Sequence, residues 1–448
     1  MLAKSKSGKL TFAVLAVLLL TVVLAACGDA TNTTAPATTA PAATTAAAAP
    51  TTAAATTAAA MTTAAATTAA GTSAAATTAA GTTSAATTAA ATSAAATTAS
   101  GTAGADSALP PGITAASLNA NLNGSGSTLV NPALKVWQTE FGKLAPNVKV
   151  NYPAGGSGQG RSDFLTGKTD FGVSDVQITS AELQQNNKDP KSVIMIPATL
   201  AAVVLTYNVP GVSDLQLSPE VIGGIYTGKI TKWDDAKIKA DNPNATLPSL
   251  DIKFAVRSDS SGTSDVFTSY LVAISPDFSA AMGGKSSGQP KWENAGINVT
   301  TASGNDGVAG LVKQTPGTLG YNEVAYALQN NLTYASIKNA AGKFVKPTLD
   351  NISAAAGSAK PDDNLKVVLV NQPGDNTWPI STTTYFLLNK DYSDAAKGQA
   401  IVALVWFATH QGGTDAKSAN YAPLPSSLVS LVEAKLKTIT AGGQPVIK

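Results

Sequence analysis

The segment Val148-Lys149-Val150-Asn151-Tyr152-Pro153-Ala154-Gly155-Gly156-Ser157-Gly158-Gln159-Gly160-Arg161 places a short β-branched run directly before a glycine-rich loop. Residues 148–152 are typical of a strand. The apolar pair Phe164-Leu165 after the loop indicates a helix. A strand, a loop and a helix in this order are characteristic of α/β folds with parallel sheets.

The alternation of strands and helices continues along the chain. Buried strands are predicted at residues 193–197, 202–207, 367–370 and 385–388, and helices at residues 401–407 and 428–432. From about Gly112 onward the composition is that of a globular protein. A stretch of about 340 residues exceeds what one hydrophobic core usually covers. We therefore expect an α/β fold with two lobes, each a mainly parallel sheet flanked by helices.

Four loops in this pattern share one composition. They are residues 124–129, 154–161, 170–175 and 256–264. Three of them are rich in Gly, Ser and Thr and stand at predicted helix starts. Small residues there let an oxyanion approach the backbone, where free N–H groups and the helix dipole favour negative charge. Together the four loops predict an anion site.

Motifs of the common catalytic and nucleotide-binding sites are absent from the sequence. Residues 156–160 are followed by Arg161, which breaks a dinucleotide-binding fingerprint, and no P-loop occurs. Ser157 is not in a nucleophile elbow, because position 159 is Gln. His410 is the only histidine and stands at a predicted helix end. We therefore predict no catalytic residue, no metal site and no cofactor.

The N-terminus carries the pattern of an export signal. Lys4, Lys6 and Lys9 precede the apolar residues 10–26, and Leu24-Ala25-Ala26-Cys27 resembles a bacterial lipobox. A transmembrane helix that ends in an incidental Cys is the alternative. We expect a signal peptide over residues 1–26 and lipid on Cys27, the only cysteine of the chain.

Charge and composition place the rest of the leader. The 448-residue chain has a formal net charge of +2, and removal of the three N-terminal lysines lowers it by three, to −1. This balance gives no case for nucleic-acid binding. Residues 30–105 carry no charge and are almost entirely Ala and Thr. They cannot form a core, and residues 27–111 are predicted to be a disordered tether, about 50 Å across as a coil.

The globular part resembles the phosphate-binding lipoproteins of phosphate-specific ABC importers of the Pst type. The resemblance runs over residues 122–435, and its segments are Gly124-Ser125-Gly126-Ser127-Thr128, residues 150–157, 170–175, 225–235 and 257–271, Gly304-Asn305-Asp306-Gly307, Gly320-Tyr321, Ala325-Tyr326-Ala327 and Trp378-Pro379-Ile380-Ser381. It implies a two-lobed, type II-like periplasmic-binding-protein fold with the anion in the interlobe cleft. Lobe 1 would comprise residues 112–205 and 380–448, and lobe 2 residues 206–379.

The resemblance also implies a set of phosphate ligands. Matched position by position, they are Thr128, the Leu129 backbone N–H, Ser157, Asp175, Arg257, Ser261, Gly262 and Thr263. Two departures stand out: Leu129 replaces an aromatic residue, and Gly158-Gln159 replace the usual Ser and Gly. Arg161 is also uncommon at its position and either adds positive potential or is a solvated side chain of the first helical turn.

Asp175 is expected to select the anion. Phosphate keeps a proton near neutral pH and can donate it to a carboxylate, whereas sulfate cannot, and sites of this kind reject the wrong analogue by factors on the order of 10⁴. The alternative for Asp175 is a helix N-cap. Arg257 would either form a bidentate contact with phosphate oxygens or be held by a carboxylate. The Gly304-Asn305-Asp306-Gly307 segment is interpreted as a structural turn.

These observations favour a monomeric, non-enzymatic receptor, attached to the membrane through Cys27, which delivers phosphate to ABC permease subunits. Three alternatives remain open: a binding protein for sulfate, molybdate or a phosphonate; a phosphoester hydrolase with a Ser nucleophile; and a surface scaffold on the tether. The hydrolase would need a base or metal that the sequence does not provide.

Overall fold

The structure is a computed structural model and describes residues 108–357 and 359–447. The predicted signal peptide, Cys27 and nearly all of the predicted tether lie outside the described residues. Ala108 and Leu109 are buried against the hydrophobic core. The packed part of the chain therefore begins a few residues before the predicted boundary at 112.

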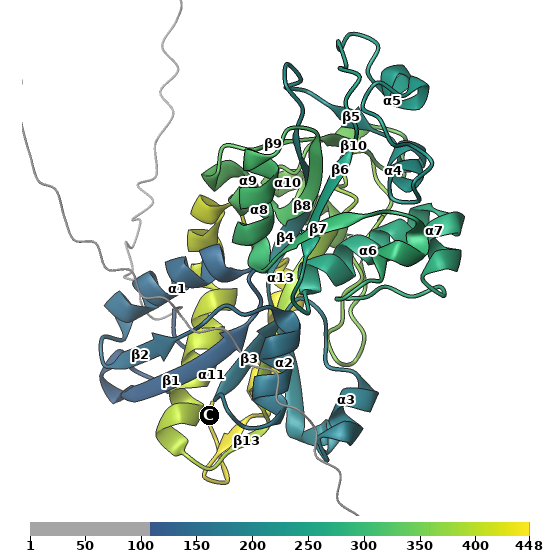
Figure 1. Cartoon of the computed structure of the whole chain (residues 1–448). Helices are drawn as coiled ribbons and strands as arrows, with labels where there is room; N and C mark the ends of the chain where they lie inside the picture. Colours follow the sequence, from purple (N-terminus) through teal and green to yellow (C-terminus); the bar gives the residue numbers. More distant parts are fainter. Residues whose placement is uncertain (1–107, 358, 448) are drawn as a thin grey trace, which may run out of the picture. The chain divides into compact units, whose positions relative to one another are not determined.

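A mixed sheet of nine strands organises the described chain (Figure 1). Eight strands follow the order β2-β1-β3-β12-β4-β8-β6-β7, and β9 pairs with β4 beside them. Their bounds are β1 (Ala120–Gly126), β2 (Val148–Asn151), β3 (Phe171–Ser174), β4 (Val193–Asn208), β6 (Lys253–Arg257), β7 (Val299–Ala302), β8 (Thr318–Glu323), β9 (Thr333–Tyr334) and β12 (Ser381–Asn389).

Strand β4 connects the two halves of this sheet. Its residues 193–202 pair with β12, and its residues 203–208 pair with β8. The two strands predicted at 193–197 and 202–207 are thus one strand of 16 residues. Because β4 continues without a break, it ties β1, β2 and β3 to β6, β7 and β8.

Strand direction differs between the outer strands and the middle of the sheet. β1 is parallel to β2 and β3, and β6 is parallel to β7 and β8. β12 is antiparallel to β3 and β4, and β4 is antiparallel to β8. The parallel outer strands have their carboxyl ends at a common edge, which is where the four predicted loops begin.

Thirteen α-helices accompany the strands in the described residues. They are α1 (Asn131–Leu144), α2 (Ser157–Leu165), α3 (Ser180–Gln185), α4 (Pro219–Ile225), α5 (Ala236–Asp241), α6 (Gly262–Ile274), α7 (Pro276–Ala281), α8 (Gly304–Gln314), α9 (Val324–Gln329), α10 (Leu349–Gly357), α11 (Ala395–Thr409), α12 (Gln411–Asp415) and α13 (Ser426–Leu436). Helices α1, α2 and α11 pack with β1, β2 and β3, whereas α6, α8 and α9 pack with β6 and β8 (Figure 1). The predicted helices at 401–407 and 428–432 lie in α11 and α13.

Short strands complete the fold. β5 (Gln216–Leu217), β10 (Ser336–Lys338) and β11 (Phe344–Val345) form one small sheet, and β13 (Asp391–Tyr392), β14 (Thr440–Ala441) and β15 (Gln444–Pro445) form another. None of the helices in the described residues is long and apolar enough to cross a membrane.

Two sequence predictions about elements are wrong. Residues 367–370 do not form a strand: Val370 makes only an isolated bridge with Ile380, and Val368 is 58% exposed. A β-branched run without a neighbouring strand has nothing to pair with. Gly304-Asn305-Asp306-Gly307 is not a turn but the first turn of α8, because Val308, Ala309 and Val312 bury one face of a helix there.

Gly160 tests the close packing of α2 on the sheet. A Cβ at Gly160 would lie 2.5 Å from Gly126 Cα and 2.6 Å from the Val173 carbonyl oxygen, both backbone atoms that cannot rotate away. Gly160→Ala is therefore expected to lower the free energy of unfolding by about 1–3 kcal/mol in urea titrations.

Gly142→Ala is the matched control, because a Cβ at Gly142 in α1 would meet nothing within 4 Å. This variant is expected to be up to about 1 kcal/mol more stable than the wild type, since Ala favours helix over Gly. Equal stability of the two variants would contradict the packing described for α2.

Candidate anion-binding site

The loops after β1 and β3 and the start of α2 converge at one edge of the sheet. Gly126 pairs with Val173 in the parallel β1–β3 ladder, and Ser127 N–H donates to the Val173 carbonyl oxygen at 2.9 Å. Gly156 N–H donates to the Gly126 carbonyl oxygen at 2.8 Å. The strand order and the small residues therefore bring three of the four predicted loops together.

Asp175 lies at the centre of this convergence and is 3% exposed. Ser127 Oγ donates to its two carboxylate oxygens at 2.7 Å each, Thr384 Oγ1 donates at 2.8 Å, and Ser157 Oγ donates at 3.0 Å. The N-cap alternative for Asp175 is wrong, because the next helix, α3, begins at Ser180 and is capped by Thr179.

The ionisation of Asp175 reflects two opposing effects. Burial raises its pKa, and the hydrogen bonds from Ser127, Thr384 and Ser157 together with the charge of Arg257 oppose this rise. The net pKa stays above its ordinary value. A carboxylate with a raised pKa is a strong acceptor for a proton donor that reaches it.

Arg257 at the end of β6 is held by a carboxylate, which was one of the two predicted possibilities. Its Nε donates to Asp259 Oδ1 at 2.8 Å, and its Nη2 donates to Asp259 Oδ2. Nη1 donates to Thr263 Oγ1 at 3.2 Å. Burial of Asp259 opposes its ionisation, but the hydrogen bond and charge of Arg257 outweigh it and lower the pKa of Asp259.

The start of α6 touches Asp175 directly. Ser261 caps this helix by accepting the Ser264 N–H at 3.0 Å, and Gly262 is its first residue. A Cβ at Gly262 would lie 2.3 Å from Ser157 Oγ and 2.4 Å from Asp175 Oδ2. Only glycine allows the helix N-terminus to come this close.

The eight predicted ligands lie together in one buried cluster, here called the anion cluster. Besides the contacts above, Leu129 N–H donates to Ser127 Oγ at 3.0 Å, and Thr128 Oγ1 accepts from Asn305 Nδ2 at 3.0 Å. The members of the anion cluster are Thr128, Leu129, Ser157, Asp175, Arg257, Ser261, Gly262 and Thr263.

Four further side chains of this region were not predicted: Ser127, Asp259, Asn305 and Thr384. Three of them stand within quoted motifs, and an acid two residues after Arg257 could have indicated Asp259 as its partner. Thr384 lies in β12, 209 residues from Asp175, and no local pattern marks it.

Arg161 fits neither of its predicted roles. Its Nε donates to Glu182 Oε1 at 2.7 Å, its Nη1 donates to Ser174 Oγ at 3.2 Å, and its side chain is only 16% exposed. It is therefore a largely buried ion pair and not a solvated side chain.

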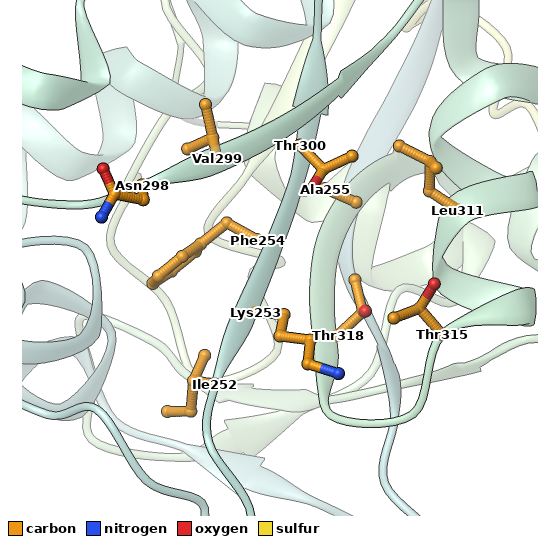
Figure 2. A pocket seen from close by; sticks show the side chains of 10 residues that line it. All are labelled: Ile252, Lys253, Phe254, Ala255, Asn298, Val299, Thr300, Leu311, Thr315 and Thr318. Atoms are coloured by element: carbon orange, nitrogen blue, oxygen red, sulfur yellow. The ribbon is translucent and has the colours of Figure 1, made fainter.

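A cleft of about 770 Å³ opens beside Asp175. Arg161 and residues 175–182 line one side, and residues 265–286 and 366–370 contribute to the other. A separate cavity of about 330 Å³ lies beside β6 and β7, and Figure 2 shows its lining residues. It contains no member of the anion cluster.

Glu323, at the end of β8, is a buried carboxyl beside the cluster. Its Oε2 accepts the Ala325 N–H at 2.9 Å, and no partner of its Oε1 is found in the described part of the chain. Tyr421 Oη lies 2.5 Å from the Leu129 carbonyl oxygen and 2.8 Å from Glu323 Oε2. Because a hydroxyl has one proton, a protonated Glu323 would satisfy both contacts, and burial indeed raises its pKa well above the ordinary value.

Comparison with known proteins identifies the family. A family model described as "PBP superfamily domain" matches residues 92–400. The phosphate-binding protein PstS of Xylella fastidiosa (strain 9a5c) is 34% identical over 317 residues, which are 70% of this chain and 84% of that protein. The chain belongs to the PstS family. The PstS of Haemophilus influenzae is 35% identical over 323 residues, 71% of this chain and 93% of that protein.

Solved structures of PstS-like proteins share the fold. A high-affinity periplasmic phosphate-binding protein bound with phosphate superposes with a TM-score of 0.56 at 21% identity, covering 70% of this chain and 93% of that chain. A phosphate-binding protein from Stenotrophomonas maltophilia gives 0.55 at 20% identity, covering 70% and 94%. The predicted two-lobed α/β fold of periplasmic binding proteins is confirmed.

Glu323→Gln tests the state of the buried carboxyl, since the amide resembles a protonated Glu that cannot ionise. The folded pKa of Glu323 lies above its unfolded value of about 4.3, so the stability it contributes is full below that pH and is lost as the pH rises. The variant should therefore gain stability relative to the wild type between pH 5 and pH 8 in urea titrations.

Asp259→Asn is the control, because the folded pKa of Asp259 is lowered instead. Its contribution is present above an unfolded pKa of about 3.9 and is lost only in more acidic solution. Its stability difference from the wild type should stay constant from pH 5 to pH 8. The same constancy in Glu323→Gln would contradict the raised pKa.

Proposed function

We propose that this chain captures inorganic phosphate in the cleft between its lobes and delivers it to an ABC-type phosphate importer. The observation that carries the proposal is the buried Asp175 carboxylate against the N-terminus of α6. The names of the PstS relatives support the same ligand.

The chemistry of the anion cluster suits a partly protonated oxyanion. Hydroxyls of Thr128, Ser157, Ser261 and Thr263 can donate to phosphate oxygens, as can the Leu129 and Gly262 backbone N–H groups and Arg257. Asp175 would accept the proton that phosphate retains. Fully ionised sulfate has no such proton, and the carboxylate would repel it.

The position of Arg257 suits an anion that carries little net charge into the site. Asp259 balances the guanidinium through two hydrogen bonds, so that only Nη1, beside Thr263, remains directed toward the cluster. Capture would thus rest on fixed dipoles and one shared positive charge. This agrees with a predicted mature chain of net charge −1.

The protein works outside the cytoplasm in this proposal. Cleavage before Cys27 and lipid on that residue would anchor it to the bacterial cell membrane, and residues 27–111 would tether the folded part. The monomeric receptor would meet the permease subunits of the importer, with no nucleic acid and no cofactor involved. Lobe 1 (112–205 and 380–448) and lobe 2 (206–379) would close on phosphate by a hinge motion.

Enzymatic hydrolysis is not part of the proposal. The ring of His410, the one possible imidazole base, is engaged by Trp406, Thr409 and Glu433. Within residues 108–357 and 359–447 there is no group of three or more His, Cys, Asp or Glu side chains that could hold a metal ion. A Ser nucleophile in the anion cluster would lack both kinds of activation.

Calorimetric titration with phosphate and sulfate tests the proposed ligand. The purified wild-type chain should bind phosphate at roughly micromolar affinity or tighter, about 8 kcal/mol, and should show no sulfate binding. Asp175→Asn should weaken phosphate binding and admit sulfate, because its amide neither repels sulfate nor requires a proton.

Lys143→Ala on the exposed side of α1 serves as the control and should bind as the wild type does. Wild-type protein that binds both anions equally, or neither, would refute the proposed function.

A further inference from the structure

Asn305 joins two loops of the anion cluster from the first turn of α8. It is fully buried, and its Nδ2 donates to Thr128 Oγ1 at 3.0 Å and to Thr263 Oγ1 at 3.2 Å. Thr128 follows β1, and Thr263 stands in α6 after β6. These strands belong to opposite halves of the sheet, so one amide group spans the interlobe boundary.

The orientation of the Asn305 amide is fixed by its other contacts. Its Oδ1 accepts the Glu323 backbone N–H at 3.0 Å, which an NH₂ group could not do. Its backbone carbonyl oxygen accepts from Asn322 Nδ2 at 2.8 Å, and Asn322 Oδ1 accepts from Thr206 Oγ1 at 2.8 Å. The NH₂ side of Asn305 must therefore face the two threonines.

Both threonine hydroxyls have their acceptor capacity filled. Thr263 Oγ1 accepts from Asn305 Nδ2 and from Arg257 Nη1, each at 3.2 Å. Thr128 Oγ1 accepts from Nδ2 at 3.0 Å and from the Asn305 backbone N–H at 3.4 Å. A hydroxyl has two acceptor lone pairs and one proton. No acceptor for either proton occurs among residues 108–357 and 359–447.

We infer that Asn305 is a positioning residue of the phosphate site, which makes Thr128 and Thr263 act only as donors toward a bound anion. The inference rests on the proposed function. With their lone pairs occupied, the two hydroxyls cannot accept a proton from the ligand and must each meet an unprotonated oxygen.

This arrangement assigns a direction to the anion. The oxygens beside Thr128 and Thr263 are unprotonated, and the protonated oxygen turns toward Asp175, which alone in the cluster is a carboxylate. Asn305 thereby contributes to selection of tetrahedral oxyanions that carry one proton and at least two free oxygens. Its contacts from one lobe to the other also make the donor orientation depend on closure.

A double-mutant cycle tests the inference on the full chain, with phosphate affinity measured by calorimetry. Asn305→Ala and Thr128→Val are each expected to weaken binding about tenfold, the loss of one oriented hydrogen bond. Because Asn305 acts through the Thr128 hydroxyl, the double variant should lose no more than about thirtyfold. A loss of about a hundredfold, the product of the single losses, would overturn the inference.

Asn305→Asp provides a second route if Asn305→Ala does not fold, since a carboxylate keeps an acceptor for the Glu323 N–H. Its other oxygen would accept the threonine protons and withdraw them from the anion. We expect about a hundredfold weaker phosphate binding, reduced to about tenfold when measured relative to Thr128→Val alone. An equal loss in both backgrounds would overturn the inference.

Asn298→Ala is the matched control, because Asn298 lines the separate cavity in Figure 2 and lies outside the anion cluster. It should bind phosphate as the wild type does. Wild-type protein that fails to bind phosphate would refute the proposed function itself. Wild-type binding with independent Asn305 and Thr128 losses would refute only the role of Asn305.

Discussion

The buried carboxylate of Asp175 is the constraint on which the site depends. A carboxylate removed from water is unfavourable unless hydrogen bonds compensate it, and three hydroxyl side chains from three different segments do so here. Ser127 comes from the loop after β1, Ser157 from the start of α2, and Thr384 from β12. These segments must be adjacent for Asp175 to be buried, and the β1–β3–β12 strand order makes them so.

The same constraint explains the glycines at the cleft. The N-terminus of α6 can meet Asp175 only because Gly262 has no Cβ, and α2 can meet β1 and β3 only because Gly160 has none. Unpaired N–H groups and the helix dipole are thus brought to a carboxylate that would otherwise repel an anion. The result is a buried site with donors on several sides and one acceptor, which matches the hydrogen-bonding pattern of partly protonated phosphate.

Local sequence patterns predicted the fold where packing agrees with local preference. The strand, loop and helix between residues 148 and 165 follow directly from β-branched residues and glycines. The long strand β4 was divided because Pro197 lacks an N–H, but Pro197 sits beside a register shift in the β4–β12 ladder, where a proline is tolerated. The strand expected at 367–370 failed because strand propensity has no effect without a partner strand.

The candidate site was predictable to the extent that its residues stand in contiguous motifs. Resemblance to the phosphate-binding family gave all eight members of the anion cluster, and the structure brings them together. Asn305 and Thr384 escaped because their contacts are made across long sequence separations: 177 residues to Thr128 and 209 to Asp175. A single sequence contains no local signal for which asparagine fills a threonine's lone pairs.

The approach of α6 to Asp175 is most directly tested by the phosphate affinity of Gly262→Ala. The new Cβ would lie within 2.4 Å of both Ser157 Oγ and Asp175 Oδ2, so the two lobes could not close around the anion. Affinity should fall by about a hundredfold or more, some 2.7 kcal/mol. Gly310→Ala in α8, where a Cβ meets nothing within 4 Å, should leave it unchanged. Affinity of Gly262→Ala within about threefold of the wild type, under 0.7 kcal/mol, would contradict the account.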